Sequence, residues 1–161
     1  LSCADKYLDD GKIHIVAAPG SGKTTLGIEL IGRIGEPVLI LAPSVTIREQ
    51  WKDRIVSAFL KEGEDPDKWI SQNLRNPAPI TIATYQALHS AMTRYSGVLD
   101  DDNEDEGESD DSVEKTRESV DFSGFNLVAT MRAIGARVMC LDECHHLRSE
   151  WWKALEMIQL R

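Results

Sequence analysis

Short apolar runs alternate with helical patterns along most of this 161-residue chain. Strands are predicted over residues 13–17, 38–41, 80–84 and 138–141. Those at 38–41 and 138–141 are apolar throughout, as expected for strands buried in a parallel sheet. Between them, apolar side chains recur at four-residue spacing, which indicates helices. The alternation predicts an α/β fold with a mainly parallel sheet, helices on both faces, and functional residues at the carboxyl ends of the strands.

Polar residues and glycines between the runs predict where the helices begin and end. Gly35 ends the first helix. Thr46 and Glu49 form a capping box that begins the next one, and Asn126 caps a later helix. Further helices are expected over residues 67–75, over residues 85–95 and after Ser149.

The formal net charge of the chain is −9, but its acidic residues are unevenly distributed. Between Asp100 and Asp121 lie 12 of the 27 acids and 2 of the 18 bases, which leaves 15 acids and 16 bases elsewhere. The rest of the chain therefore has no electrostatic reason to avoid nucleic acid. We expect residues 97–124 to be an acidic, solvated or disordered insert within a single lobe that spans residues 1–161.

No run of about 18 apolar residues is present, so no membrane helix is expected, and the amino end lacks a signal-peptide pattern. Three cysteines in a chain of this length do not make a disulfide framework. We therefore expect a cytoplasmic protein. Because the chain starts without Met and ends inside a helical pattern, we also expect it to be a piece of a longer protein.

A glycine-rich segment lies between the first apolar run and the first helical pattern, which is the context that a phosphate-binding loop requires. Residues 17–24 read AAPGSGKT. In such a loop, glycines let backbone N–H groups turn toward phosphate oxygens, Lys23 reaches the β and γ phosphates, and Thr24 offers its hydroxyl to Mg²⁺. The residues expected to bind the nucleotide are Pro19, Gly20, Ser21, Gly22, Lys23, Thr24 and Thr25.

Two acids, Asp142 and Glu143, directly follow the last apolar run. A P-loop enzyme needs a carboxylate for its magnesium ion and a group that orients the attacking water. We expect Asp142 to hold the metal together with Thr24, and Glu143 to align the water. The catalytic residues are then Lys23, Asp142 and Glu143.

Four residues near this pair are of types that also bind zinc, namely Cys140, Cys144, His145 and His146. Their spacing argues against a zinc site. Cys140 belongs to a buried strand, and no second ligand pair occurs elsewhere, so inert core cysteine is the favoured interpretation.

The order of these motifs resembles that of superfamily 2 helicases of the DExH or DEAD-box-related kind. In the amino-terminal RecA-like lobe of that family, motif I reads AxxGxGKT, as residues 17–24 do, and motif II in its DExH form is similar to residues 142–145. Residues 43–51 (PSVTIREQW) resemble motif Ia, although Val45 stands where Arg is usual, and residues 84–88 (TYQAL) resemble motif Ib. Residues 146–152 are similar to bacterial helicase and restriction-type translocase sequences.

The resemblance implies a RecA-like P-loop fold, ATP and Mg²⁺ as cofactors, and DNA or RNA as a partner. It also implies a second RecA-like lobe whose arginine fingers complete the ATP site, so the isolated chain should hydrolyse ATP very poorly. His145 is expected to couple hydrolysis to movement. The expected nucleic-acid contacts are Pro43, Ser44, Arg48 and Thr84.

Other functions stay open from the sequence alone. A double-strand DNA translocase that never unwinds its track would carry the same motifs. A small-molecule kinase would need an Arg-rich lid where this chain has an acidic loop. An interaction module with a relic nucleotide site is disfavoured, because Lys23, Thr24, Asp142 and Glu143 are all present.

Overall fold

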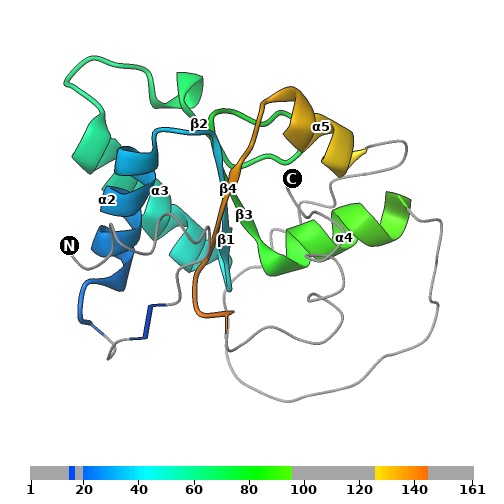
Figure 1. Cartoon of the computed structure of the whole chain (residues 1–161), viewed down its shortest axis with the longest axis horizontal. Helices are drawn as coiled ribbons and strands as arrows, with labels where there is room; N and C mark the ends of the chain where they lie inside the picture. Colours follow the sequence, from blue (N-terminus) through cyan, green and yellow to red (C-terminus); the bar gives the residue numbers. More distant parts are fainter. Residues whose placement is uncertain (1–14, 17–19, 96–125, 145–161) are drawn as a thin grey trace. The chain divides into compact units, whose positions relative to one another are not determined.

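The computed structural model describes residues 15–16, 20–95 and 126–144 (Figure 1). The chain forms two compact units, residues 1–35 and residues 36–161, and each is described by itself. A single lobe spanning the whole chain stays a prediction. The acidic insert at residues 97–124 and the helix expected after Ser149 lie outside the described residues.

The first unit contains helix α2 (Lys23–Ile34). The helix buries Ile28, Leu30 and Ile31. Gly35 ends it in the left-handed conformation, with φ 67°, and its N–H donates to the carbonyl of Ile31 at 3.0 Å. The stop signal read from the sequence is therefore confirmed. Of the strand expected over residues 13–17, only residues 15 and 16 are described, and they are exposed and not part of a strand.

The second unit is built on a sheet of four strands in the order β2-β3-β1-β4. Its strands are β1 (Val38–Ala42), β2 (Ile70–Ser71), β3 (Ile80–Thr84) and β4 (Val138–Leu141). All three strand pairs are parallel, and β1 lies in the interior between β3 and β4. Every residue of β1 is fully buried. The parallel pairings confirm the expected α/β fold. The full burial of β1 agrees with its sequence, because a strand covered on both faces is apolar without alternation.

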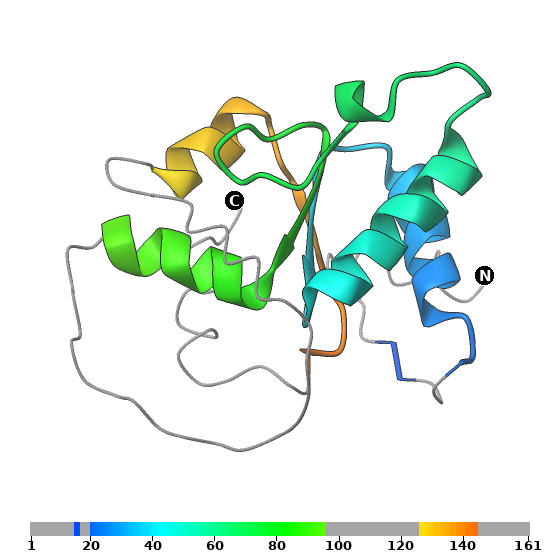
Figure 2. The ribbon, with the colours of Figure 1, turned by 180° about the vertical axis from the view of Figure 1, so that it is seen from behind.

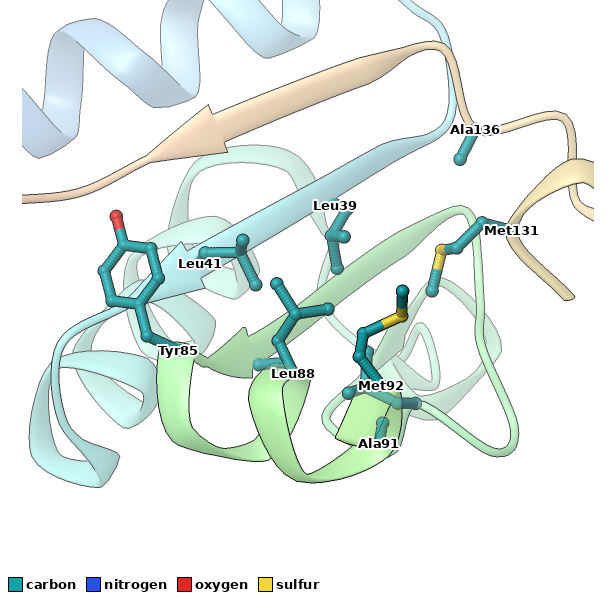
Figure 3. Packing of buried hydrophobic residues seen from close by; sticks show 10 residues of the cluster. Leu39, Leu41, Tyr85, Leu88, Ala91, Met92, Met131 and Ala136 are labelled. Atoms are coloured by element: carbon teal, nitrogen blue, oxygen red, sulfur yellow. The ribbon is translucent and has the colours of Figure 1, made fainter. Parts of the chain in front are cut away.

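Helices cover both faces of this sheet. Helix α3 (Val45–Phe59) lies on one face, and helices α4 (Tyr85–Tyr95) and α5 (Leu127–Ala133) lie on the other, as the two opposite views agree (Figures 1 and 2). On the α4 and α5 face, Leu39 and Leu41 of β1 meet Leu88 of α4 and Met131 of α5 in the main hydrophobic cluster (Figure 3). On the other face, α3 buries Trp51 and Ile55.

Two local predictions are confirmed and two are wrong. Asn126 caps α5, since its Oδ1 accepts from the N–H of Ala129 at 2.9 Å, and α4 spans the expected residues. The cap of α3 is Ser44 instead of Thr46, because the Ser44 Oγ accepts from the N–H of Ile47. Residues 67–75 do not form a helix. They belong in part to a short 3₁₀ helix (Pro66–Lys68) and to β2, which pairs with β3. Within the described residues, no helix is long and apolar enough to cross a membrane.

Candidate nucleotide and metal site

The glycine-rich loop of the first unit has the backbone conformation that its sequence predicts. Gly20 and Gly22 adopt left-handed conformations, with φ 77° and φ 85°. Among the described residues, and apart from the chain neighbours, no atom lies within 4 Å of where a Cβ would be added to either glycine. Glycine is thus required by the backbone angle and not by close packing against protein atoms.

Helix α2 begins immediately after Gly22 with no side chain capping its amino end and no acidic residue in its first turn. The N-cap residue Gly22 has no side chain to bond the first turn, and the helix brings no carboxylate of its own to its amino end. Lys23 and Thr24 are half-buried, whereas Gly20, Ser21, Gly22 and Thr25 are exposed. Pro19 lies outside the described residues. This part of the predicted phosphate site has the polarity and the backbone shape that phosphate binding needs.

The acidic pair of the second unit lies at the carboxyl end of β4. Strand β4 ends at Leu141, and the N–H of Asp142 still donates to the carbonyl of Leu41 in β1 at 2.9 Å. This bond continues the parallel ladder by one residue and fixes the direction in which the chain leaves the sheet. The carboxyl end of β1 lies beside it, with Leu41 in register with Leu141, and the carboxyl end of β3 lies next to that of β1, with Thr84 in register with Ala42.

Two aromatic residues hold Asp142. The indole Nε1–H of Trp51, from α3, donates to the carboxylate Oδ2 at 2.7 Å. The hydroxyl of Tyr85, the first residue of α4, donates to the main-chain carbonyl of Asp142 at 2.9 Å. Both rings are buried, Trp51 at 2% and Tyr85 at 0% exposure. Figure 3 shows the Tyr85 hydroxyl directed toward the end of β4.

Sequence reasoning missed both aromatic residues as parts of the site. Trp51 and Tyr85 lie in the segments that resemble motifs Ia and Ib, but neither was among the predicted site residues. The usable signal is that Tyr and Trp carry a polar group that needs a partner when the ring is buried. The helix of Trp51 follows β1, which pairs with β4, and Tyr85 follows β3, the next strand beyond β1.

Glu143 has an unusual backbone. Its φ of 51° places it in the left-handed region, and it is the one non-glycine residue with positive φ in the described part of the chain. A residue with a Cβ is strained there, and such strain persists where the surrounding structure imposes it, often at functional sites. The backbone therefore marks the same residue that the sequence pattern selects for orienting water.

Burial affects two ionisable groups around Asp142. Burial raises the pKa of the Cys140 thiol to about 12, and the nearby charge of Asp142 adds to the effect. Burial also raises the pKa of Tyr85 above its ordinary value, with smaller contributions from Cys144 and Asp142. The Tyr85 hydroxyl thus stays protonated and can donate its hydrogen bond at neutral pH. Cys140 is a neutral core thiol, in line with the interpretation that it is inert.

The donor atoms fit magnesium better than a softer metal. The Asp142 carboxylate of the second unit supplies hard oxygen atoms, which are the ligands that Mg²⁺ prefers. Among the residues that the structure describes, no group of three His, Cys, Asp or Glu side chains is arranged to hold a metal ion. Among the described residues, Trp51 is the side-chain donor to the Asp142 carboxylate, and it bonds to Oδ2.

The residues expected to contact nucleic acid gather at the carboxyl ends of β1 and β3. Pro43 and Ser44 connect β1 to α3, Arg48 lies in the first turn of α3, and Thr84 ends β3. Two hydroxyls already cap helices, because the Ser44 Oγ accepts from Ile47 and the Thr84 Oγ1 accepts from the N–H of Ala87 at 3.1 Å.

Arg48 is the charged member of this group. One of its Nη atoms donates to Glu49 at 3.0 Å, while its buried Nε has no hydrogen-bond partner in the described structure. Its side chain is 21% exposed. The nucleic-acid role of these residues stays a prediction, as does the coupling role of His145, which lies outside the described residues.

An all-parallel α/β sheet, a glycine-rich loop that begins a helix, and an Asp-Glu pair at a strand end define a RecA-like lobe of the superfamily 2 helicase class. The chain belongs to the family described as type III restriction enzyme, res subunit, whose pattern matches residues 5–160. The resemblance inferred from motifs I and II is therefore confirmed at the level of the family.

Curated relatives agree with this assignment. The chain is 31% identical over 97 residues to the "Putative DNA 3'-5' helicase Rad25" of Halobacterium salinarum, a match that covers 60% of the chain and 16% of the relative. It is 31% identical over 86 residues to the "DNA 3'-5' helicase XPB" of Mycobacterium tuberculosis, covering 53% of the chain and 15% of the relative. The matched segment thus spans only a small part of each relative.

Proposed function

We propose that the chain is the ATP- and Mg²⁺-binding lobe of a DExH-type helicase, a nucleic-acid-dependent ATPase. The observation that carries the proposal is the loop from Gly20 to Gly22, whose two left-handed glycines lead into a helix without a capping side chain or an acidic first turn. This arrangement presents backbone N–H groups and the positive end of the helix dipole to phosphate oxygens.

In the proposed reaction, water attacks the γ-phosphate in line with the departing ADP oxygen. Lys23 holds the β and γ phosphates and neutralises charge that develops on them. Thr24 and Asp142 are the residues that would hold Mg²⁺, and the bound ion would stabilise the same charge. Glu143 orients and polarises the attacking water. The family resemblance supports these roles, and the backbone of Glu143 and the bonds around Asp142 are consistent with them.

The rest of the catalytic apparatus comes from a second RecA-like lobe. In P-loop ATPases an arginine finger is worth about 10³–10⁵-fold in rate, so a lobe without one turns over slowly. We propose that closing and opening of two lobes moves the protein along its track. Both relatives described above are named DNA 3'-5' helicases, and we therefore propose DNA as the track and 3′ to 5′ as the direction.

Equilibrium nucleotide binding tests the first part of the proposal directly. Wild-type chain should bind ATP in the presence of Mg²⁺, measured by titration calorimetry. Lys23→Ala should lose at least tenfold in affinity, because it removes the charge on the β and γ phosphates. Lys61→Ala is the matched control, since Lys61 is an exposed lysine outside the loop and should leave binding unchanged. Equal affinities for all three proteins would refute the proposed nucleotide site.

A further inference from the structure

Asp142 is held at two separate points by side chains from two different helices. Trp51 of α3 donates to its carboxylate at 2.7 Å, and Tyr85 of α4 donates to its main-chain carbonyl at 2.9 Å. The two helices lie on opposite faces of the sheet (Figures 1 and 2). Asp142, whose carboxylate the proposed function assigns to magnesium, is therefore held through its side chain from one face of the sheet and through its backbone from the other.

The Trp51 bond does more than satisfy a buried N–H group. An indole N–H needs a partner when buried, but a neutral carbonyl would serve for that purpose. The partner here is a carboxylate, and a hydrogen bond to a charged acceptor is shorter and stronger than a neutral one. The bond fixes Oδ2 and with it the rotation of the carboxylate plane, and it leaves the other oxygen to face a ligand.

The Tyr85 bond restrains a different degree of freedom. Asp142 lies just beyond the end of β4, and the next residue, Glu143, has a strained backbone with φ 51°. The hydroxyl of Tyr85 holds the carbonyl between these two residues. It thus anchors the peptide unit from which both acidic side chains are oriented.

We propose that Trp51 and Tyr85 are positioning residues for the magnesium site, Trp51 through the carboxylate of Asp142 and Tyr85 through its backbone. This inference rests on the proposed function, because it assumes that Asp142 holds Mg²⁺. Partners that orient a metal ligand typically contribute about 10–100-fold to metal affinity. A residue that only fills the core would affect stability without affecting metal dependence.

The test measures ADP binding to the full chain with and without Mg²⁺, by titration calorimetry, for conservative variants. Trp51→Phe removes the N–H and keeps an aromatic ring, and Tyr85→Phe removes only the hydroxyl. Each should weaken binding of Mg²⁺-ADP by about tenfold and leave binding of metal-free ADP unchanged. Trp69→Phe is the matched control, because Trp69 is 45% exposed and ends the short 3₁₀ helix Pro66–Lys68; it should bind like the wild type.

Asp142→Ala separates failure of this inference from failure of the proposed function. If Asp142→Ala keeps the full magnesium dependence of the wild type, Asp142 is not a metal ligand, and both proposals fall. If Asp142→Ala loses that dependence while Trp51→Phe and Tyr85→Phe keep it, only the positioning role is overturned. Adding Trp51→Phe to Asp142→Ala should cause no further loss, because the bond it removes is already absent.

A spectroscopic measurement does not depend on nucleotide binding. In a ¹H–¹⁵N spectrum of the full chain, the signal that Trp51→Phe removes identifies the indole N–H of Trp51. This signal should shift in Asp142→Ala and should exchange with solvent faster there. An unchanged signal would show that the bond does not form, and would overturn the assignment of Trp51 even if that variant folds poorly in the binding assay.

Discussion

The strained backbone of Glu143 predicts that glycine at this position stabilises the chain relative to alanine. Both Glu143→Gly and Glu143→Ala remove the carboxylate, so they differ only in the cost of the backbone. A left-handed conformation costs a residue with a Cβ about 1–2 kcal/mol. The gain from removing this cost is reduced by about 0.4–1 kcal/mol, because a glycine makes the unfolded chain more flexible and so lowers the free energy of unfolding. We therefore expect Glu143→Gly to exceed Glu143→Ala by roughly 1 kcal/mol in free energy of unfolding.

At a position inside a helix, the glycine variant should instead be less stable than the alanine variant. Asp53 is exposed in the middle of α3, and Asp53→Gly should be less stable than Asp53→Ala by about 1 kcal/mol. Urea unfolding followed by circular dichroism measures all four variants. If glycine is the less stable choice at both positions, residue 143 is not strained in the folded chain, and the backbone argument for its functional role fails.

Three further outcomes are expected. Ser44→Ala should lower the free energy of unfolding by about 1 kcal/mol, whereas Thr46→Ala should change it little, because the cap of α3 is Ser44. A larger loss for Thr46→Ala in urea unfolding would instead support the capping box of Thr46 and Glu49. Leu39→Ala should cost about 3 kcal/mol, since Leu39 is fully buried in the main cluster, and a cost below 1 kcal/mol would contradict that packing. The isolated chain should hydrolyse ATP at least 10³-fold more slowly than the two-lobe protein, and equal rates in a phosphate-release assay would remove the need for a second lobe.

The sheet of the second unit was predictable because burial leaves a strong mark on sequence. Residues 38–41 and 138–141 are apolar throughout, and residues 80–84 combine apolar residues with two threonines. Strands β1 and β3 lie in the interior of the described sheet, whereas β4 lies at its edge and is only partly buried. Strand β2 was missed because it has only two residues, and its pairing with β3 is a tertiary contact that no local pattern encodes. The same limit explains the error over residues 67–75, where Asp65 and Pro66 begin a 3₁₀ turn instead of a longer helix.

The candidate site, like the fold, was predictable only in part. Asp142 and Glu143 were identified from their position after an apolar run. The partners of Asp142 were not, because Trp51 and Tyr85 lie 91 and 57 residues away in sequence. Helical spacing places Trp51 on the buried face of α3, but it says nothing about where the indole N–H is directed. Only the register of the strands brings these residues together.

The most direct test of the proposed function is the ATPase rate of the two-lobe protein with single-stranded DNA, duplex DNA and RNA, each compared with the rate in the absence of nucleic acid. Glu143→Gln is the control, since it keeps the size of the side chain and removes its charge. We expect DNA to stimulate hydrolysis and Glu143→Gln to abolish it. A rate that is indifferent to all three nucleic acids but lost in Glu143→Gln would contradict the assignment of a DNA motor and leave an ATPase with another partner.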